Sequence, residues 1–146
     1  MRGYFGIGVY HPKHEVNIGT LWRHAMGLGA AFIFTIGERY HRQAADTPKT
    51  WKHRPLFHFA TWEDFVEHQP YDCPLVCVEL AETAHELPAF THPERCVYLL
   101  GAEDHGLPEC IMAGHAVVTI PGGLCYNVAT AGTMVMYDRW LKREMA

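Results

Sequence analysis

Short, uninterrupted apolar runs separated by segments with helical spacing constrain the fold of this chain most. Five runs have the length of strands: Tyr4–Tyr10, Ala30–Ile36, Pro74–Leu80, Cys96–Leu100 and Ala116–Ile120. Runs without polar alternation are typical of strands buried on both faces, as in a parallel sheet. Because helical segments separate the runs, the sequence predicts an α/β fold with a mainly parallel sheet.

Start signals predict three helices between these strands. The signals are Asn17 as a cap of the first helix and Thr61 with Asp64 as a capping-box-like pair of the second, after the brief apolar stretch 56–59. The third signal is Pro108 in the first turn of its helix. The first helix is expected to end at Gly27 and Gly29. Residues 37–55 are polar and show no periodicity, and a loop of this length in a compact domain is expected to be functional.

The last predicted helix runs from Val128 to Lys142, and its residues Val128 to Tyr137 carry no charge. A helix that is apolar all round must be covered on every side. A chain of 146 residues has the length of one domain, so a single domain spanning residues 1–146 is expected. In so small a domain, we expect a partner subunit to cover one side of this helix.

Composition excludes several classes of protein. With 49% hydrophobic and 19% charged residues, the chain is typical of a globular protein and not of a disordered one. Five cysteines without CxxC spacing favour reduced thiols and a cytoplasmic location. No metal site is expected, because the pairs Cys73/Cys77 and His11/His14 lack a matching second pair. No apolar run approaches the roughly 18 residues of a membrane span.

Three loops that leave the predicted strands are candidates for a site, because parallel sheets bind ligands at the carboxyl ends of their strands. Their sequences are NIGTLWR (17–23), LGAEDHGLP (100–108) and IPGGLCYNV (120–128). Alone, each block also has a plain structural explanation: a cap with a solvated arginine, an acidic turn, or a flexible glycine turn. None completes a GxGxxG, GxxxxGK[ST] or GxSxG motif.

In this order and at these separations, the blocks resemble the three motifs of the SpoU/TrmH family of RNA 2'-O-ribose methyltransferases, within the SPOUT superfamily. The matching residues are Asn17, Gly19, Arg23, Gly101, Glu103, Gly106, Leu107, Pro108, Ile120, Pro121, Asn127 and Val128. The resemblance is to minimal single-domain members that modify the tRNA wobble position. It implies a parallel-sheet SPOUT (α/β knot) fold with a C-terminal deep trefoil knot.

The resemblance also implies a cofactor, partners and site residues. The cofactor is S-adenosylmethionine, and the partners are an RNA substrate, with tRNA favoured over rRNA, and a second copy of the chain bound through the uncharged final helix. The implied cofactor-binding residues are Val78, Gly101, Glu103, Ile120, Cys125 and Asn127. The implied catalytic residues are Arg23, Asn127, Glu103 and Asn17. Family members have serine at the position of Cys125, so the polar contact made there is expected to differ.

Arg23 is expected to act near the cofactor of the partner subunit. The family mechanism assigns the motif-one arginine as a base assisted by a substrate phosphate. A guanidinium group holds its protons very tightly, so clamping the phosphate and stabilising the developing alkoxide is the physically easier role.

The net charge of −4 conceals a gradient along the chain. Residues 1–54 carry eight Lys and Arg against three acids, a net charge of +5, whereas residues 55–146 carry four against thirteen, a net charge of −9. Basic residues beside Trp51 suit a clamp on an RNA backbone with a base-stacking partner, although a solvated loop would have the same composition. The predicted RNA-binding residues are Arg23, Arg42, Lys49, Lys52 and Arg54.

Two other functions stay open at this point. One is a cysteine-dependent hydrolase that uses Cys125 with a histidine, which requires a base close to the thiol in space. The other is a catalytically idle RNA-binding relative. The cysteine at 125 favours the idle relative, whereas the intact Arg23 and Asn127 weigh against it.

Overall fold

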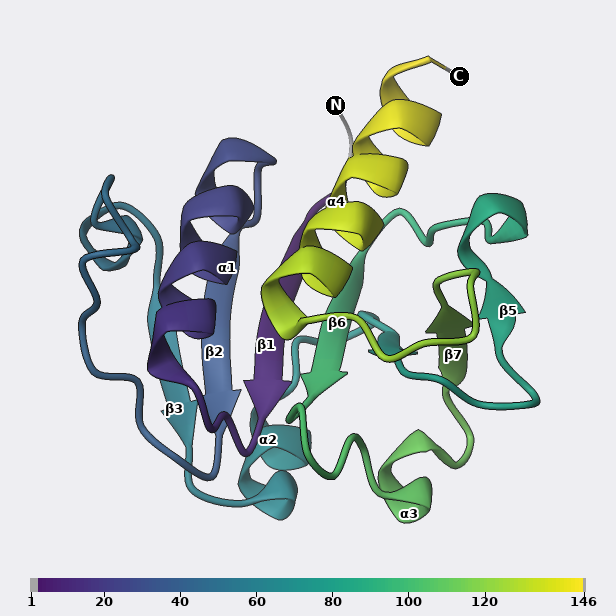
Figure 1. Ribbon diagram of the computed structural model, residues 1–146, viewed down its shortest axis with the longest axis horizontal. Coiled ribbons are helices and arrows are strands. Elements are labelled where there is room, and N and C mark those ends of the chain that lie inside the picture. Colours follow the sequence, from purple (N-terminus) through teal and green to yellow (C-terminus); the bar gives the residue numbers. More distant parts are fainter. Residues whose placement is uncertain (1–2, 146) are drawn as a thin grey trace.

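The computed structural model describes residues 3–145 and contains a seven-stranded sheet in the order β3-β2-β1-β6-β4-β7-β5 (Figure 1). Every pair of neighbouring strands is parallel. The strands are β1 (Phe5–Tyr10), β2 (Phe32–Ile36), β3 (Leu56–Phe59), β4 (Leu75–Val78), β5 (His85–Glu86), β6 (Cys96–Gly101) and β7 (Ala116–Thr119). The predicted parallel α/β fold is therefore confirmed.

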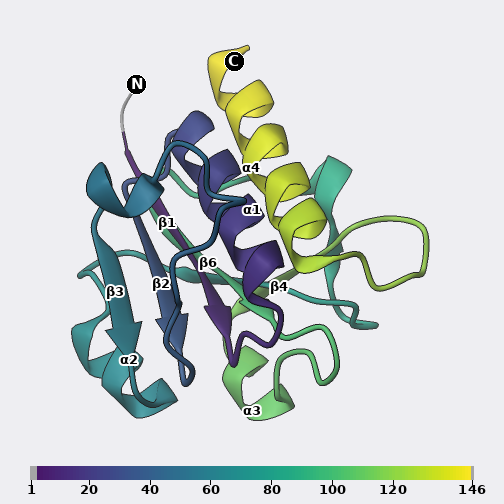
Figure 2. The same ribbon diagram turned by 60° about the vertical axis from the view of Figure 1, so that its left-hand side comes forward.

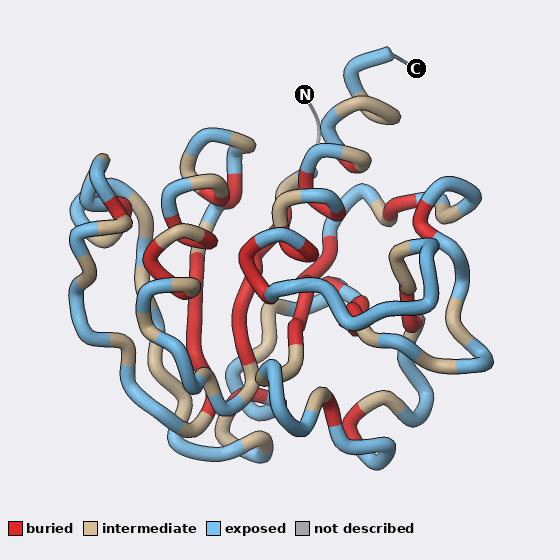
Figure 3. The backbone as a smooth tube through the Cα atoms, in the orientation of Figure 1, coloured by how far each residue is buried: buried red, intermediate tan, exposed pale blue. Residues whose placement is uncertain are grey.

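Helices cover both faces of this sheet. They are α1 (Glu15–Gly27), α2 (Trp62–His68), α3 (Glu109–Met112) and α4 (Val128–Glu144), with the 3-10 turns η1 (Thr50–Lys52) and η2 (Leu87–Ala89). In Figure 2, α1 and α4 lie side by side on one face. Their buried side chains form one hydrophobic cluster with β1 and β6, and α2 and α3 contribute to a second cluster. Figure 3 shows that the buried positions follow the strands and the inner sides of α1 and α4.

The structure differs from the sequence predictions at two elements. Helix α1 begins at Glu15 with His14 at its cap position, so the prediction that Asn17 caps this helix is wrong. The Asn17 amide bonds instead to a side chain on another loop, as described below. Strand β5 was not predicted, because its two residues are exposed and no apolar run marks them.

Residues 37–55 form the predicted long loop, broken only by η1. Buried Asp46 holds it: the Thr50 N–H donates to one carboxylate oxygen at 2.9 Å, and the Thr50 hydroxyl lies 2.7 Å from the other. The same hydroxyl lies 3.1 Å from the Trp22 carbonyl oxygen of α1. Gly19 permits this close docking, because a Cβ there would lie 2.8 Å from Cβ of Gln43. The first motif thus supports the loop.

The chain returns from β7 to α4, which packs beside α1 near the middle of the sheet. This path is compatible with the C-terminal knot that the sequence resemblance implies. Among the described residues, no helix is both long and apolar enough to span a bilayer.

Candidate functional site

A cavity of about 370 Å³ lies where β4, β6 and β7 end. Its walls include five of the six predicted cofactor-binding residues: Val78, Gly101, Glu103, Ile120 and Cys125. They meet because parallel strands present their carboxyl ends at one edge of a sheet. Asn127 does not line the cavity but hydrogen-bonds to Glu103 in its wall.

The second motif forms a tight loop that makes one wall of this cavity. The chain doubles back so closely that a Cβ on Gly101 would lie 2.4 Å from the carbonyl carbon of Gly106. The Gly106 N–H donates to the Ala102 carbonyl at 2.8 Å, and Gly106 has a φ of +62°, which favours glycine. The two motif glycines therefore have a structural reason: they let this wall form.

Glu79 is a cavity residue that the sequence reasoning missed. It follows β4, and its two carboxylate oxygens accept hydrogen bonds from the backbone N–H groups of Leu80 and Leu107, each at 2.9 Å. The bond to Leu107 ties the end of β4 to the second motif. A carboxylate directly after a buried strand could have marked this position.

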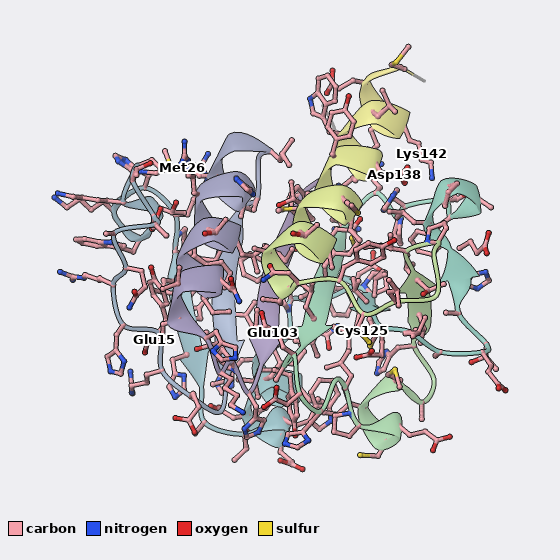
Figure 4. All side chains as sticks on the ribbon, viewed as in Figure 1. Glu15, Met26, Glu103, Cys125, Asp138 and Lys142 are labelled. Atoms are coloured by element: carbon pink, nitrogen blue, oxygen red, sulfur yellow. The ribbon has the colours of Figure 1, made fainter. Side chains whose placement is uncertain are left out.

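The three motifs converge on the carboxylate of Glu103, which lies close to the start of α4 in Figure 4. Its Oε1 accepts hydrogen bonds from the side-chain amides of Asn17 and Asn127, the latter at 3.4 Å. Its Oε2 lies 3.3 Å from Nε2 of His14. Asn127 also caps α4, because its Oδ1 accepts from the N–H of Ala129 at 2.9 Å. Three of the four predicted catalytic residues therefore share one polar cluster.

A larger groove of about 1080 Å³ lies on the other side of the 102–106 loop, at the ends of β1 and β2. Its lining includes His11, His14, Tyr40 and His41. Ala102, Asp104, His105 and Gly106 line both hollows, so this loop is their common wall. An ion pair between Lys13 and Asp104 fastens the wall to the loop before α1.

Arg23, the fourth predicted catalytic residue, lies elsewhere. It is exposed on α1 and lines neither hollow. Beside it, Nδ1 of His24 lies 2.7 Å from the Thr133 hydroxyl and joins α1 to α4. Within one chain, the structure therefore does not bring Arg23 to Glu103.

Exposed apolar side chains run along α4. Met134, Tyr137 and Trp140 are 38%, 51% and 42% exposed, and the rings of Tyr137 and Trp140 stack with centroids 5.8 Å apart. The outer side of α4 is thus uncovered in the single chain.

The predicted RNA-binding residues of the long loop fall into two groups. Cζ of Arg42 lies 3.6 Å from the centroid of the Trp51 ring, Nζ of Lys52 lies 5.4 Å from it, and Lys49 is exposed. Arg54 differs, since its Nε donates to the Ala30 carbonyl at 2.8 Å and ties the loop to the start of β2. The guanidinium group of Arg54 therefore has a hydrogen-bond partner within the fold. Arg2, which contributes to the N-terminal positive charge, lies outside the described residues.

The cysteines differ in exposure. Cys110 and Cys125 are exposed, and no described histidine forms a hydrogen bond with Cys125. Burial raises the pKa of Cys77 to about 12 and that of Cys96 to about 11. These observations on the cysteines give no support to a cysteine-dependent hydrolase.

The described residues contain no group of three or more side chains suited to hold a metal ion.

Comparison with known families gives one match over most of the chain. A model of the SpoU rRNA Methylase family matches residues 5–137. A search of curated proteins found no match.

Solved structures share the fold at low sequence identity. An AdoMet-bound rRNA methyltransferase from Sinorhizobium meliloti is 22% identical with a TM-score of 0.83, over 100% of this chain and 58% of that one. A structure described under the 2-OH methylation of C/U34 on tRNA is 21% identical with a TM-score of 0.85, over 99% of both chains. The TrmH/SpoU tRNA modifying enzyme from A. aeolicus is 17% identical with a TM-score of 0.84, over 97% of this chain and 76% of that one.

Proposed function

The chain belongs to the SpoU rRNA methylase family, and we propose that it transfers a methyl group from S-adenosylmethionine to a ribose 2'-hydroxyl of RNA, with tRNA as substrate. The observation that carries the proposal is the convergence of three motifs on Glu103 beside the 370 Å³ cavity. The relative described for tRNA 2-OH methylation supports the choice of tRNA, because the two chains match over 99% of their lengths. In this proposal, residues 1–146 form one methyltransferase domain that acts in the cytoplasm.

The cavity suits S-adenosylmethionine in size and lining. Its volume of about 370 Å³ falls in the range of small-molecule sites. Val78, Ile120 and Leu124 provide apolar walls, and the closely packed 101–107 loop offers backbone groups. When bound there, the cofactor supplies an electrophilic methyl group on a positively charged sulfur. Cys125 lies in the same wall, where its thiol offers only a weak hydrogen bond.

The chain contributes chiefly by positioning the reactants. Methyl transfer is an in-line displacement, so the target hydroxyl must be held within near-attack distance of the methyl group. Glu103 fixes the amides of Asn17 and Asn127, which are then preorganised to orient the ribose. Arg23 clamps the adjacent phosphate and stabilises the alkoxide that forms as the hydroxyl loses its proton.

We propose that the active form is a homodimer joined through α4. The exposed row of Met134, Tyr137 and Trp140 supplies the apolar surface for such an interface. Arg23 lies on α1, which packs beside α4, and it lines neither hollow of its own chain. A dimer through this face would let Arg23 reach the partner's cavity.

The decisive experiment incubates the protein with tritiated S-adenosylmethionine and unmodified tRNA or rRNA, and then maps the labelled nucleotide. We expect a 2'-O-methylated nucleotide in tRNA, and no transfer by Arg23→Ala although this variant still binds the cofactor. Label on a base, or unchanged transfer by Arg23→Ala, would contradict the proposal. If calorimetry detects no cofactor binding, the chain is an idle RNA-binding relative.

Mixing two inactive variants tests the dimer. If Arg23 acts in the partner's site, Arg23→Ala and Glu103→Ala subunits form hybrid dimers with one intact site each. Random mixing then restores about a quarter of the wild-type activity, because half of the dimers are hybrids with one working site of two. No recovery in hybrids verified by native mass spectrometry would show that Arg23 acts within its own chain.

A further inference from the structure

The charges around the 370 Å³ cavity are unbalanced. Among the described residues that line it, three are carboxylic acids, Glu79, Glu103 and Asp104, and none is lysine or arginine. Asp104 pairs with Lys13, and Glu103 lies 3.3 Å from His14. Within the described chain, Glu79 has no cationic side chain at ion-pair distance, and its bonds come from the backbone. Glu79 is therefore the cavity carboxylate without a charged partner.

Glu79 is also held rigidly. The N–H groups of Leu80 and Leu107 each donate to a different oxygen at 2.9 Å, which fixes both oxygens at the cavity wall. A carboxylate oxygen accepts more than one hydrogen bond, so each keeps acceptor capacity toward the cavity. The side chain is only partly exposed, and a charge there acts through a medium less screening than bulk water. A ligand in the cavity therefore meets a fixed negative charge.

We propose that Glu79 is a specificity-determining residue that makes the cavity prefer the sulfonium cofactor over the thioether product of the same reaction. This inference rests on the proposed function. In methyl transfer, the bond between sulfur and the methyl carbon breaks and its electron pair stays on sulfur, while the methyl carbon bonds to the ribose oxygen. The proton of the hydroxyl goes to solvent. The cofactor thereby loses one positive charge and little of its shape.

A fixed carboxylate without a charged partner distinguishes two ligands that differ chiefly in the positive charge on sulfur. It attracts the positively charged cofactor more than the neutral-sulfur product, so it favours exchange of product for fresh cofactor. A residue that only shaped the wall would affect both ligands alike. The ratio of the two dissociation constants therefore reports the charge of Glu79, separately from its part in folding the loop.

Calorimetry on the intact wild-type protein and on Glu79→Gln would measure this ratio. The probes are S-adenosylmethionine, S-adenosylhomocysteine and an analogue with an amine-bearing carbon in place of the sulfur. Glutamine keeps the shape and an acceptor oxygen but removes the charge. We expect the preference for the two cationic ligands over the thioether to fall about three- to tenfold, where tenfold corresponds to about 1.4 kcal/mol. Glu82→Gln is the matched control, since Glu82 is an exposed acid three residues away that does not line the cavity.

A salt series on the wild type provides a second measurement that does not depend on the variant's folding. Raising the ionic strength should reduce the preference for S-adenosylmethionine over S-adenosylhomocysteine, because salt screens a partly exposed charge. A ratio that is unchanged in Glu79→Gln, or one that does not change with salt, overturns the inference while the proposed function stands. If neither S-adenosylmethionine nor S-adenosylhomocysteine binds the wild type, the proposed function itself fails.

Discussion

Replacing Gly101 with alanine tests whether the doubled-back loop of the second motif shapes the cavity. The added Cβ would lie 2.4 Å from the carbonyl carbon of Gly106 and 2.6 Å from the Leu107 nitrogen. Both neighbours are backbone atoms, so no side chain can rotate away. The loop must shift by about 1 Å to restore an ordinary contact near 3.4 Å, which is an overpacking change.

The expected cost follows from that displacement. Overpacking a close contact lowers the free energy of unfolding by about 1–3 kcal/mol. For a chain of this size, each kcal/mol lowers Tm by about 2–4 °C, so we expect Tm to fall by about 2–12 °C. The shift also moves the Leu107 N–H that donates to Glu79. Affinity for S-adenosylmethionine should therefore fall at least about tenfold, or about 1.4 kcal/mol.

Differential scanning fluorimetry and calorimetry would measure both effects. Gly27→Ala is the matched control, because a Cβ at that exposed end of α1 meets no atom within 4 Å. Alanine there should leave stability unchanged or raise it by up to about 1 kcal/mol. If Gly101→Ala keeps both the wild-type Tm and the wild-type affinity, the loop does not shape the cavity as argued.

Three further predictions concern other parts of the chain. Iodoacetamide at neutral pH should alkylate exposed Cys125 but not Cys77, whose pKa burial raises to about 12, and S-adenosylmethionine should protect Cys125; peptide mass spectrometry checks both. Burial lowers the pKa of His92 below its ordinary 6.5, so the unfolded state binds more protons below pH 6.5. Stability should then fall as the pH drops from 7 to 5, and less so in His92→Gln. Thermal melts at several pH values would check this, and the same change of Tm with pH in both proteins would contradict it. Changing Lys49 and Lys52 to glutamate should weaken RNA binding and reduce the slope of log K against log salt by about 2, measured by filter binding; an unchanged slope would remove these residues from the interface.

The sheet and the location of the cavity could be predicted from sequence for a physical reason. Uninterrupted apolar runs predict buried parallel strands, and parallel strands place their carboxyl ends at one edge. That geometry alone brings Val78, Gly101 and Ile120 together, although they are far apart in the sequence.

Other features required the fold itself. Asn17 looks like a helix cap in sequence, because the capping preference is local and nothing nearby reveals Glu103 as its partner. The position of Glu79 after a strand is visible in the sequence, but its contact with the second motif requires β4 to lie between β6 and β7. Arg54 looked like one more basic side chain until its bond to the Ala30 carbonyl was visible.

The contact between Asp46 and Thr50 has a consequence for how RNA would be selected. This buried contact orders the long basic loop, and the bond from the Thr50 hydroxyl to the Trp22 carbonyl holds the loop on α1 before any ligand arrives. Ordering a flexible segment on binding costs roughly 1–2 kcal/mol of backbone entropy per residue, and a loop already in place avoids most of that cost. A preformed loop also does not change its conformation to fit different RNA molecules. Substrates would then be sorted by whether their own folded shape fits this loop.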